Sequence, residues 1–111
     1  MRILFLGDVV GISGCSKLTS SLLSEIKSKK IDFVIVNGEN AAAQGVGLTE
    51  EICKDFYNCG VNVITTGNHV WDQKEIMKYI EKEERLLRPK NLFEPAPGRG
   101  FQIFKTDKNI R

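Results

Sequence analysis

Residues 32–40 read DFVIVNGEN, and no other stretch of the sequence says as much about the fold. The apolar run Phe33–Val36 is short and continuous, as expected for a buried strand of a parallel sheet. Similar runs at Ile3–Leu6 and Val61–Ile64 recur at about the length of a βαβ unit. Right-handed crossovers place the strands of such units side by side. The sequence therefore predicts an α/β fold with three parallel strands in βαβαβ order.

The segment between the first two runs predicts the first crossover helix. Apolar residues recur at four-residue spacing from Leu18 to Ile26, so one face of this helix should pack on the sheet. We expect a loop at residues 11–14 before the helix, with Ser13 or Ser16 as its N-cap.

The remaining elements are predicted from their boundary residues. Thr49 should begin a second helix, which the stop signal Asn58–Gly60 should end. After the third strand, Asp72 is placed to cap a third helix that runs through Glu84. Prolines punctuate the following stretch, and Phe101–Phe104 is a candidate final strand.

Length, charge and cysteine usage limit the kind of protein. A chain of 111 residues forms one domain at most. Its 16 Lys and Arg against 14 Asp and Glu give a net charge of +2, too balanced to indicate an obligatory nucleic-acid or anionic membrane partner. The N-terminal apolar run is too short for a signal or membrane-spanning segment. Cys15, Cys53 and Cys59 show no metal or disulfide spacing, so we expect reduced thiols and a cytoplasmic protein.

Polar side chains follow each of the three apolar runs at the point where the strand should end. These residues are Asp8, Glu39, Asn40, Asn68 and His69, the chain's one histidine. Ligands of open α/β sheets bind along the edge where the carboxyl ends of the strands meet. Oxygen-rich side chains gathered there repel one another unless a hard divalent cation binds them. The pattern therefore indicates a metal site.

Each part of this pattern also has a simpler interpretation. Asp8 alone fits a cap or a turn, and Glu39 with Asn40 fits a turn in which the asparagine bonds its own backbone. A lone histidine such as His69 is more often structural than catalytic. The glycines after the first run match neither GxGxxG nor GxxxxGK[ST], which disfavours a nucleotide-binding loop. The acidic strand-end loops disfavour a flavodoxin-like nucleotide binder. The coincidence of all three segments at one sheet edge favours the metal site.

Several segments together resemble one known family. GDVVG at Gly7–Gly11, DFVIVNGENAA at Asp32–Ala42, GVNVITTGNHVWD at Gly60–Asp72, LLRP at Leu86–Pro89 and PGRG at Pro97–Gly100 resemble the N-terminal part of the YmdB-like metallophosphoesterases. These belong to the calcineurin-like binuclear metal hydrolases. Relative to that wider superfamily, Val10 replaces a histidine, Glu39 an aspartate and Val70 an acid, and Cys15 stands where relatives usually have an arginine.

The resemblance implies a function and a role for each candidate residue. Asp8 would bind one metal, Glu39 would bridge two, and Asn40 and Asn68 would add oxygen ligands. Two divalent ions, manganese or iron with magnesium as an alternative, would hold a bridging hydroxide for attack on phosphorus. His69 would face the substrate and protonate the leaving alkoxide. The implied activity is phosphodiester hydrolysis, with cyclic nucleotides of the 2′,3′ or 3′,5′ kind as substrates.

The same resemblance implies that part of the site is missing. Family members are roughly twice as long, and their C-terminal half supplies further metal-binding histidines and a second sheet. We therefore expect residues 1–111 to be the N-terminal portion of one domain of the calcineurin-like sandwich, truncated and carrying about half of the site. A sheet face left uncovered would favour self-association. The rival hypothesis is a non-catalytic fragment, acting as a weak metal-binding or interaction module.

Overall fold

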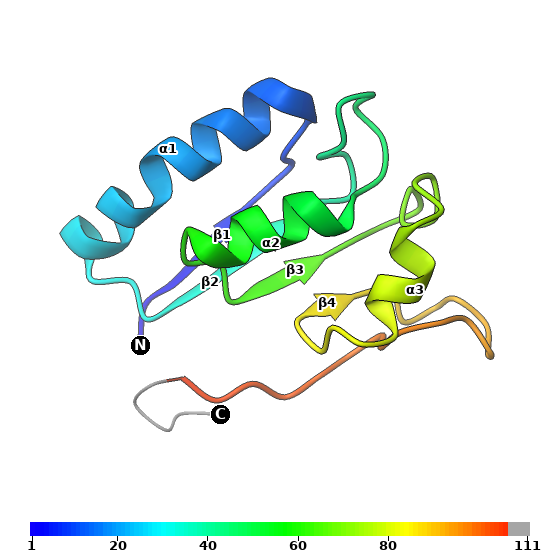
Figure 1. Ribbon diagram of the computed structural model, residues 1–111. Helices are drawn as coiled ribbons and strands as arrows, with labels where there is room; N and C mark the ends of the chain where they lie inside the picture. The colour runs from blue at the N-terminus through cyan, green and yellow to red at the C-terminus, as the bar shows by residue number, and fades with distance from the viewer. Residues whose placement is uncertain (107–111) are drawn as a thin grey trace.

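The structure, a computed structural model, describes residues 1–106, so the chain end at Arg111 lies outside the described residues (Figure 1). The elements in chain order are β1 (Ile3–Leu6), α1 (Gly11–Lys29), β2 (Phe33–Asn37), α2 (Glu50–Asn58), β3 (Val63–Thr65), α3 (Ile76–Ile80) and β4 (Leu86–Leu87). The strands form one sheet in the order β1-β2-β3-β4, and every neighbouring pair is parallel. The predicted α/β fold with three adjacent parallel strands is therefore confirmed, and β4 extends it.

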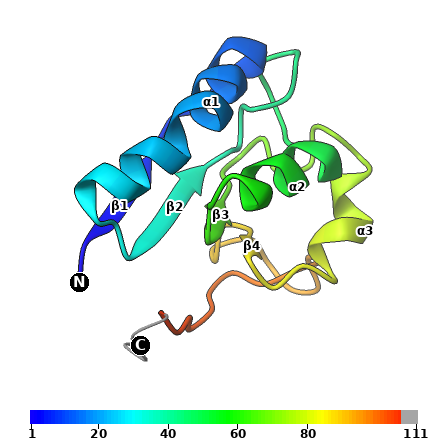
Figure 2. The ribbon, with the colours of Figure 1, turned by 60° about the vertical axis from the view of Figure 1, so that its left-hand side comes forward.

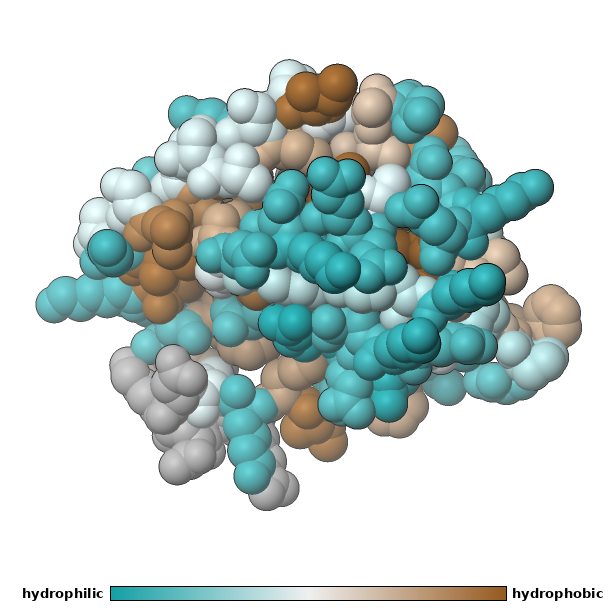
Figure 3. Space-filling view, viewed as in Figure 1, coloured by the Kyte–Doolittle hydropathy of each residue, from teal (hydrophilic) through white to brown (hydrophobic). Residues whose placement is uncertain are grey.

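One face of the sheet carries the core. Helices α1 and α2 lie over this face in both ribbon views (Figures 1 and 2). Alternate side chains of the strands, such as Val34, Val36 and Ile64, are fully buried against Leu22 of α1 and Phe56 of α2. The outer surface over α2 and α3 is mostly hydrophilic (Figure 3). Burial of one apolar face therefore fixes the sheet under its helices.

The other face of the sheet is apolar and only partly covered. Ile3 and Phe5 of β1 are 52% and 60% exposed, and they pair in register with the half-buried Phe33 and Ile35 of β2. The ring of Phe104 lies against that of Phe33, with the centroids 6.1 Å apart. The segment that follows β4 thus covers part of this face, and β1 remains open.

Helix α1 begins earlier than predicted, and its predicted serine cap is wrong. Residue Val10 is the N-cap without a side-chain hydrogen bond, and the helix already includes Ser13 and Ser16. The N–H of Gly11 donates to the carbonyl oxygen of Asn40 at 2.9 Å. Because the neighbouring loop satisfies this donor, a serine cap is not needed.

Other predicted boundaries had mixed outcomes. Thr49 caps α2 as predicted, since its Oγ1 accepts from the N–H of Ile52 at 3.2 Å. The third helix is shorter than predicted, because α3 ends at Ile80 and has Glu75 rather than Asp72 as its N-cap. Phe101–Phe104 forms no strand, which corrects that prediction. The last strand is instead β4, and Leu87 makes an isolated bridge to Arg99. Within residues 1–106, no helix has the length and apolarity needed to span a membrane.

Candidate metal centre

The loops that follow β1, β2 and β3 meet at the carboxyl edge of the sheet, as the strand order requires. Backbone hydrogen bonds fasten these loops together. The N–H of Val9 donates to Asn37 at 3.3 Å, and the N–H of Gly38 donates to Thr65 at 3.0 Å. The candidate residues from three strand ends are therefore placed by one connected network of backbone hydrogen bonds.

Asp8 and Asn40 are in direct contact. The amide nitrogen Nδ2 of Asn40 donates to Oδ2 of Asp8 at 2.7 Å, although the residues are 32 positions apart in sequence. The Oδ1 atom of Asn40 is buried and has no hydrogen-bond partner. An amide oxygen buried without a donor costs free energy, of the order of 1–3 kcal/mol. The contact with Asp8 thus leaves a free oxygen ligand on Asn40.

The carboxylate of Glu39 packs on the backbone of Gly67. A Cβ atom on Gly67 would overlap both carboxylate oxygens, so only glycine leaves room for Glu39 in this position. The Oε2 atom of Glu39 is also buried without a hydrogen-bond partner. Gly67 immediately precedes Asn68 and His69, so this contact joins the loops after β2 and β3. A turn interpretation of Glu39 and Asn40 does not explain why their side-chain oxygens are buried and unpaired.

The oxygens of Asp8, Glu39 and Asn40 are ligand types that fit a divalent cation. The buried oxygens of Glu39 and Asn40 are costly to leave unpaired unless a cation or a hydrogen-bond donor binds them, and Asn40 also contacts the negatively charged Asp8. Carboxylate and amide oxygens suit magnesium or manganese. However, the described residues contain no group of three or more His, Cys, Asp and Glu side chains close enough to hold a metal. The residues of this chain therefore fit a metal but offer few charged ligands.

Asn68 and His69 lie on a tight turn after β3. Asn68 is exposed, while the side chain of His69 is 36% exposed. Nδ1 of His69 lies 2.7 Å from Oδ2 of Asp72. The sequence pattern predicts Asp72 as a helix cap, so sequence reasoning missed its contact with His69. The spacing of three residues is compatible with such a contact, but the packing of Gly47 against Asp72 is not visible in the sequence.

Two other features near the loops lack the chemistry of a site. The thiol of Cys15 donates to the carbonyl oxygen of Ala41 at 3.2 Å, and burial, helped by the charge of Asp55, raises its pKa.

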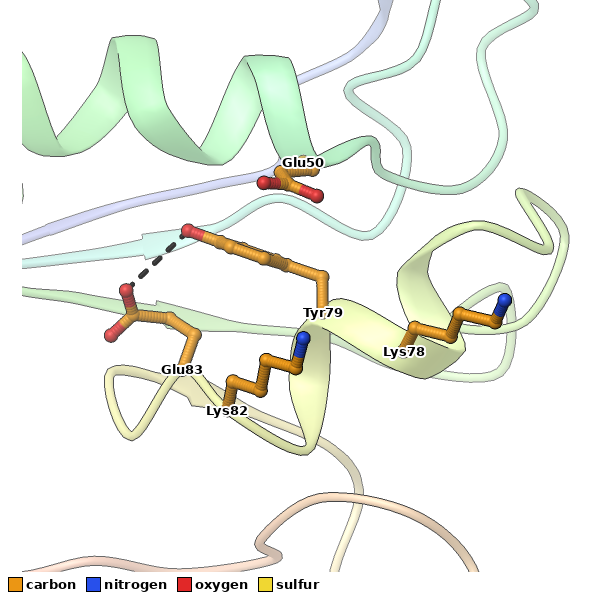
Figure 4. Close-up of a pocket in the computed structure, with 5 residues that line it drawn as sticks. All are labelled: Glu50, Lys78, Tyr79, Lys82 and Glu83. Carbon is orange, nitrogen blue, oxygen red and sulfur yellow. Dashed lines mark hydrogen bonds between the residues drawn. The ribbon is translucent and has the colours of Figure 1, made fainter.

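A pocket of about 210 Å³ lies between α2 and α3, lined by Glu50, Lys78, Tyr79, Lys82 and Glu83 (Figure 4). None of the candidate residues lines this pocket, and its charges are mixed. The strand-end loops therefore remain the candidate site.

The packing of Glu39 on Gly67 leads to a first prediction. Replacing Gly67 with Ala should displace the Glu39 carboxylate, because the added methyl group overlaps it. We expect Mn²⁺ affinity, measured by calorimetry, to fall about 10-fold or more, on the order of other losses of ligand orientation.

Gly100→Ala is the matched control for this prediction. Its added Cβ would meet Cα of Lys90 at 2.8 Å, in the segment after β4, so Mn²⁺ affinity should stay near the original value. Unchanged affinity in Gly67→Ala would mean that Glu39 is not a metal ligand in this conformation.

The chain is similar in sequence to known proteins. A model of the YmdB-like protein family matches residues 4–111. A protein of Bacillus subtilis (strain 168) named 2′,3′-cyclic-nucleotide 2′-phosphodiesterase is 45% identical over 108 residues, which cover 96% of this chain and 40% of the relative. The chain therefore spans two fifths of the length of this curated relative.

Solved structures show the same fold. The crystal structure of a hypothetical protein from Thermus thermophilus has a TM-score of 0.87 and 36% identity, covering 96% of this chain and 41% of its own. A Mycoplasma pneumoniae protein described as a novel phosphatase also has a TM-score of 0.87, with 34% identity, covering 97% of this chain and 40% of its own. Both structures extend well beyond the matched region.

Proposed function

Because the chain belongs to the YmdB-like protein family, we propose that it carries part of the active site of a metal-dependent phosphodiesterase. The observation that carries this proposal is a buried side-chain oxygen without a hydrogen-bond partner on each of the adjacent residues Glu39 and Asn40, of which Asn40 also contacts the carboxylate of Asp8. A site that only stabilised the fold would satisfy these oxygens with hydrogen-bond donors. Buried side-chain oxygens without hydrogen-bond donors support binding of a cation.

Each candidate residue has a role in this proposal. Asp8, Glu39, Asn40 and Asn68 would hold divalent ions; these oxygens suit manganese or magnesium, whereas iron would favour imidazole ligands, which this set does not include. When bound, such ions supply an activated water and neutralise charge that develops on the phosphate. His69 would donate a proton to the leaving oxygen, since its partly exposed ring lies on the loop beside Gly67 and Glu39.

The proposed substrates are small phosphodiesters. The name of the B. subtilis relative suggests a 2′,3′-cyclic nucleotide, in which the scissile oxygen is a ribose hydroxyl and a poor leaving group. Such a substrate needs a proton donor at the leaving oxygen, which is the role we give to His69. The substrate is therefore consistent with the residues of the site.

A second candidate function is that of a weak metal-binding module without turnover. The described residues contain no cluster of three or more His, Cys, Asp and Glu side chains around a common point, which favours this alternative for the chain alone. Hydrolysis of bis-p-nitrophenyl phosphate and of 2′,3′-cyclic nucleotides with added Mn²⁺ separates the two functions. Turnover above that of Mn²⁺ alone supports the phosphodiesterase.

The metal content is the second prediction. We expect the 111-residue chain to bind at most one Mn²⁺ weakly, because water must complete the coordination that protein ligands do not supply. Electron paramagnetic resonance of free and bound Mn²⁺ gives the stoichiometry. Glu39→Gln should weaken binding about 10-fold or more, since it removes the charge beside Gly67.

Glu51→Gln provides the control, because Glu51 is exposed in the first turn of α2 and also loses one negative charge. Mn²⁺ binding by this variant should match that of the unmodified chain. Two ions retained after dialysis, or equal binding by both variants, would refute the assignment of Glu39 and the incomplete ligand set.

A further inference from the structure

The carboxylate of Asp72 faces the imidazole of His69 rather than a helix end. Its Oδ2 lies 2.7 Å from Nδ1 of His69, which is a short, charge-assisted hydrogen-bond distance. Helix α3 begins four residues later, at Ile76, and has no side-chain cap. The position of this aspartate is therefore explained by the histidine and not by helix capping.

The backbone holds the two residues in this arrangement. The N–H of Asp72 donates to the carbonyl oxygen of His69 at 3.1 Å, and the N–H of Val70 donates to that of Gly67 at 3.1 Å. Val70 is 1% exposed, so the turn is anchored in the core between the two polar residues. Neither residue can shift far without breaking this turn.

A second loop fixes the far side of Asp72. A Cβ atom on Gly47 would lie 3.2 Å from Cβ of Asp72 and 2.8 Å from Cγ of Gln73, so glycine is needed for this close approach. The side chain of Gln73 also donates from Nε2 to the carbonyl oxygen of Val46 at 3.0 Å. The loop that follows Glu39 and Asn40 is thus packed against the residue that contacts His69.

This geometry determines which ring nitrogen is available. A carboxylate accepts hydrogen bonds, so Nδ1 of His69 carries the proton that points at Asp72. Nε2, on the opposite side of the ring, then holds a lone pair in the neutral ring and a proton in the charged ring. The proton to be donated is therefore at Nε2, directed away from Asp72.

We propose that Asp72 is a positioning residue, which holds His69 in the tautomer and orientation that present Nε2 to the leaving oxygen of the substrate. As the attacking hydroxide forms a new O–P bond, the P–O bond to the leaving group breaks; its electron pair stays on the leaving oxygen, which takes the Nε2 proton of the charged ring. The ring is left neutral with its remaining proton on Nδ1, where Asp72 still accepts it. The effect on turnover rests on the proposed function, whereas the choice of tautomer does not.

The competing explanation is an ordinary surface contact. The side chains of His69 and Asp72 are 36% and 39% exposed, and exposed ion pairs contribute little to stability. An exposed contact that forms only rarely in solution would leave the tautomer and the catalytic step unaffected by replacement of Asp72. The two explanations therefore differ in measurable quantities other than stability.

The tautomer is the first test. The ring nitrogens of the ¹⁵N-histidine-labelled protein are observed by NMR at a pH where the imidazole is neutral, and signals are assigned to His69 by their loss in His69→Gln. We expect a protonated Nδ1 and an unprotonated Nε2 in the unmodified protein, and a shift towards protonated Nε2 in Asp72→Ala. A ring with the same tautomer in both proteins overturns the proposal.

Turnover is the second test, and it does not depend on the spectrum. Asp72→Ala should lower kcat for a 2′,3′-cyclic nucleotide about 10- to 100-fold with little change in KM, which is less than the loss expected for the acid itself. In a His69→Ala background the same substitution should have no further effect. Equal losses in both backgrounds would show that Asp72 does not act through His69.

Glu75→Ala is the matched control. The carboxylate of Glu75 accepts from the N–H of Glu50 at 3.3 Å, so it tethers the same segment without contacting His69. The Glu75→Ala variant should keep the original tautomer and kcat. A loss of kcat equal to that of Asp72→Ala would mean that both residues act only by tethering the loop, which would overturn the proposal. If neither this chain nor a full-length member of the family shows metal-dependent turnover, the proposed function fails, and the tautomer comparison still decides the role of Asp72.

Discussion

In a full-length member of this family, replacing the counterpart of His69 with Ala should lower kcat about 10²–10⁴-fold on phosphodiesters whose leaving group is a poor one, such as a ribose hydroxyl. The loss should be much smaller with p-nitrophenolate, which leaves without a proton. Metal content should stay near that of the unmodified protein, because the proposed metal ligands are oxygens of Asp8, Glu39, Asn40 and Asn68. Parallel kinetics on both substrate types, with metal analysis of the same samples, measure all three quantities.

The pattern of losses separates two roles for His69. A proton donor gives a loss that depends on the leaving group, whereas a metal ligand gives equal losses on both substrates together with lost metal. Lys74→Ala is a suitable control, because Lys74 is exposed on the same segment and is not a candidate residue. Equal losses with lost metal would reassign His69 as a ligand.

The parallel strands could be predicted because their signal is local. Each apolar run ends in a glycine or a polar residue, and repetition of that pattern at the βαβ spacing leaves little topological freedom. The same reasoning placed Asp8 and Asn40 at neighbouring strand ends, and the 2.7 Å hydrogen bond between their side chains confirms that they lie close together. Their roles as metal ligands stay predictions, because geometry without an ion tests only their proximity.

The incorrect boundaries arose where tertiary contacts replace local signals. The first turn of α1 is satisfied by the carbonyl of Asn40, which no local pattern around Ser13 could reveal. Asp72 has the sequence of a helix cap and instead contacts His69, because Gly47 of another loop packs against it. In both cases the deciding partner is more than twenty residues away in sequence.

Strand β4 was missed for a related reason. Leu86–Leu87 is too short for a periodic pattern, and it pairs with Ile64 and Thr65 of β3 only after the sheet exists. Arg88, 5% exposed, then donates to the carbonyl oxygens of Pro97 and Pro89 at 3.1 and 3.2 Å. The buried arginine thus holds residues 89–97 as a loop, and the local sequence of Phe101–Phe104 does not reveal this tertiary contact.

The second large effect concerns the open face of the sheet. We expect the 111-residue chain to self-associate through β1, because Ile3 and Phe5 expose apolar side chains beside Phe33 and Ile35. Burying a side chain of this size contributes about 1.5–3 kcal/mol. A symmetric contact between two copies buries Ile3 and Phe5 of both copies. Sedimentation velocity over a range of concentrations should therefore show dimers or larger species.

Phe5→Lys tests which surface is responsible. Loss of two buried phenyl rings, one from each copy, should cost about 3 kcal/mol or more, which weakens self-association over about 100-fold. Met77→Lys adds the same charge on α3, where Met77 is 44% exposed on the helix-covered side, and should leave self-association unchanged. If the unmodified chain is a monodisperse monomer with a sharp cooperative melt, then the partial cover that Phe104 gives to Phe33 suffices. In that case the exposed face of β1 does not drive association, since an exposed apolar surface of this kind matters only when burial outweighs the entropy lost on association.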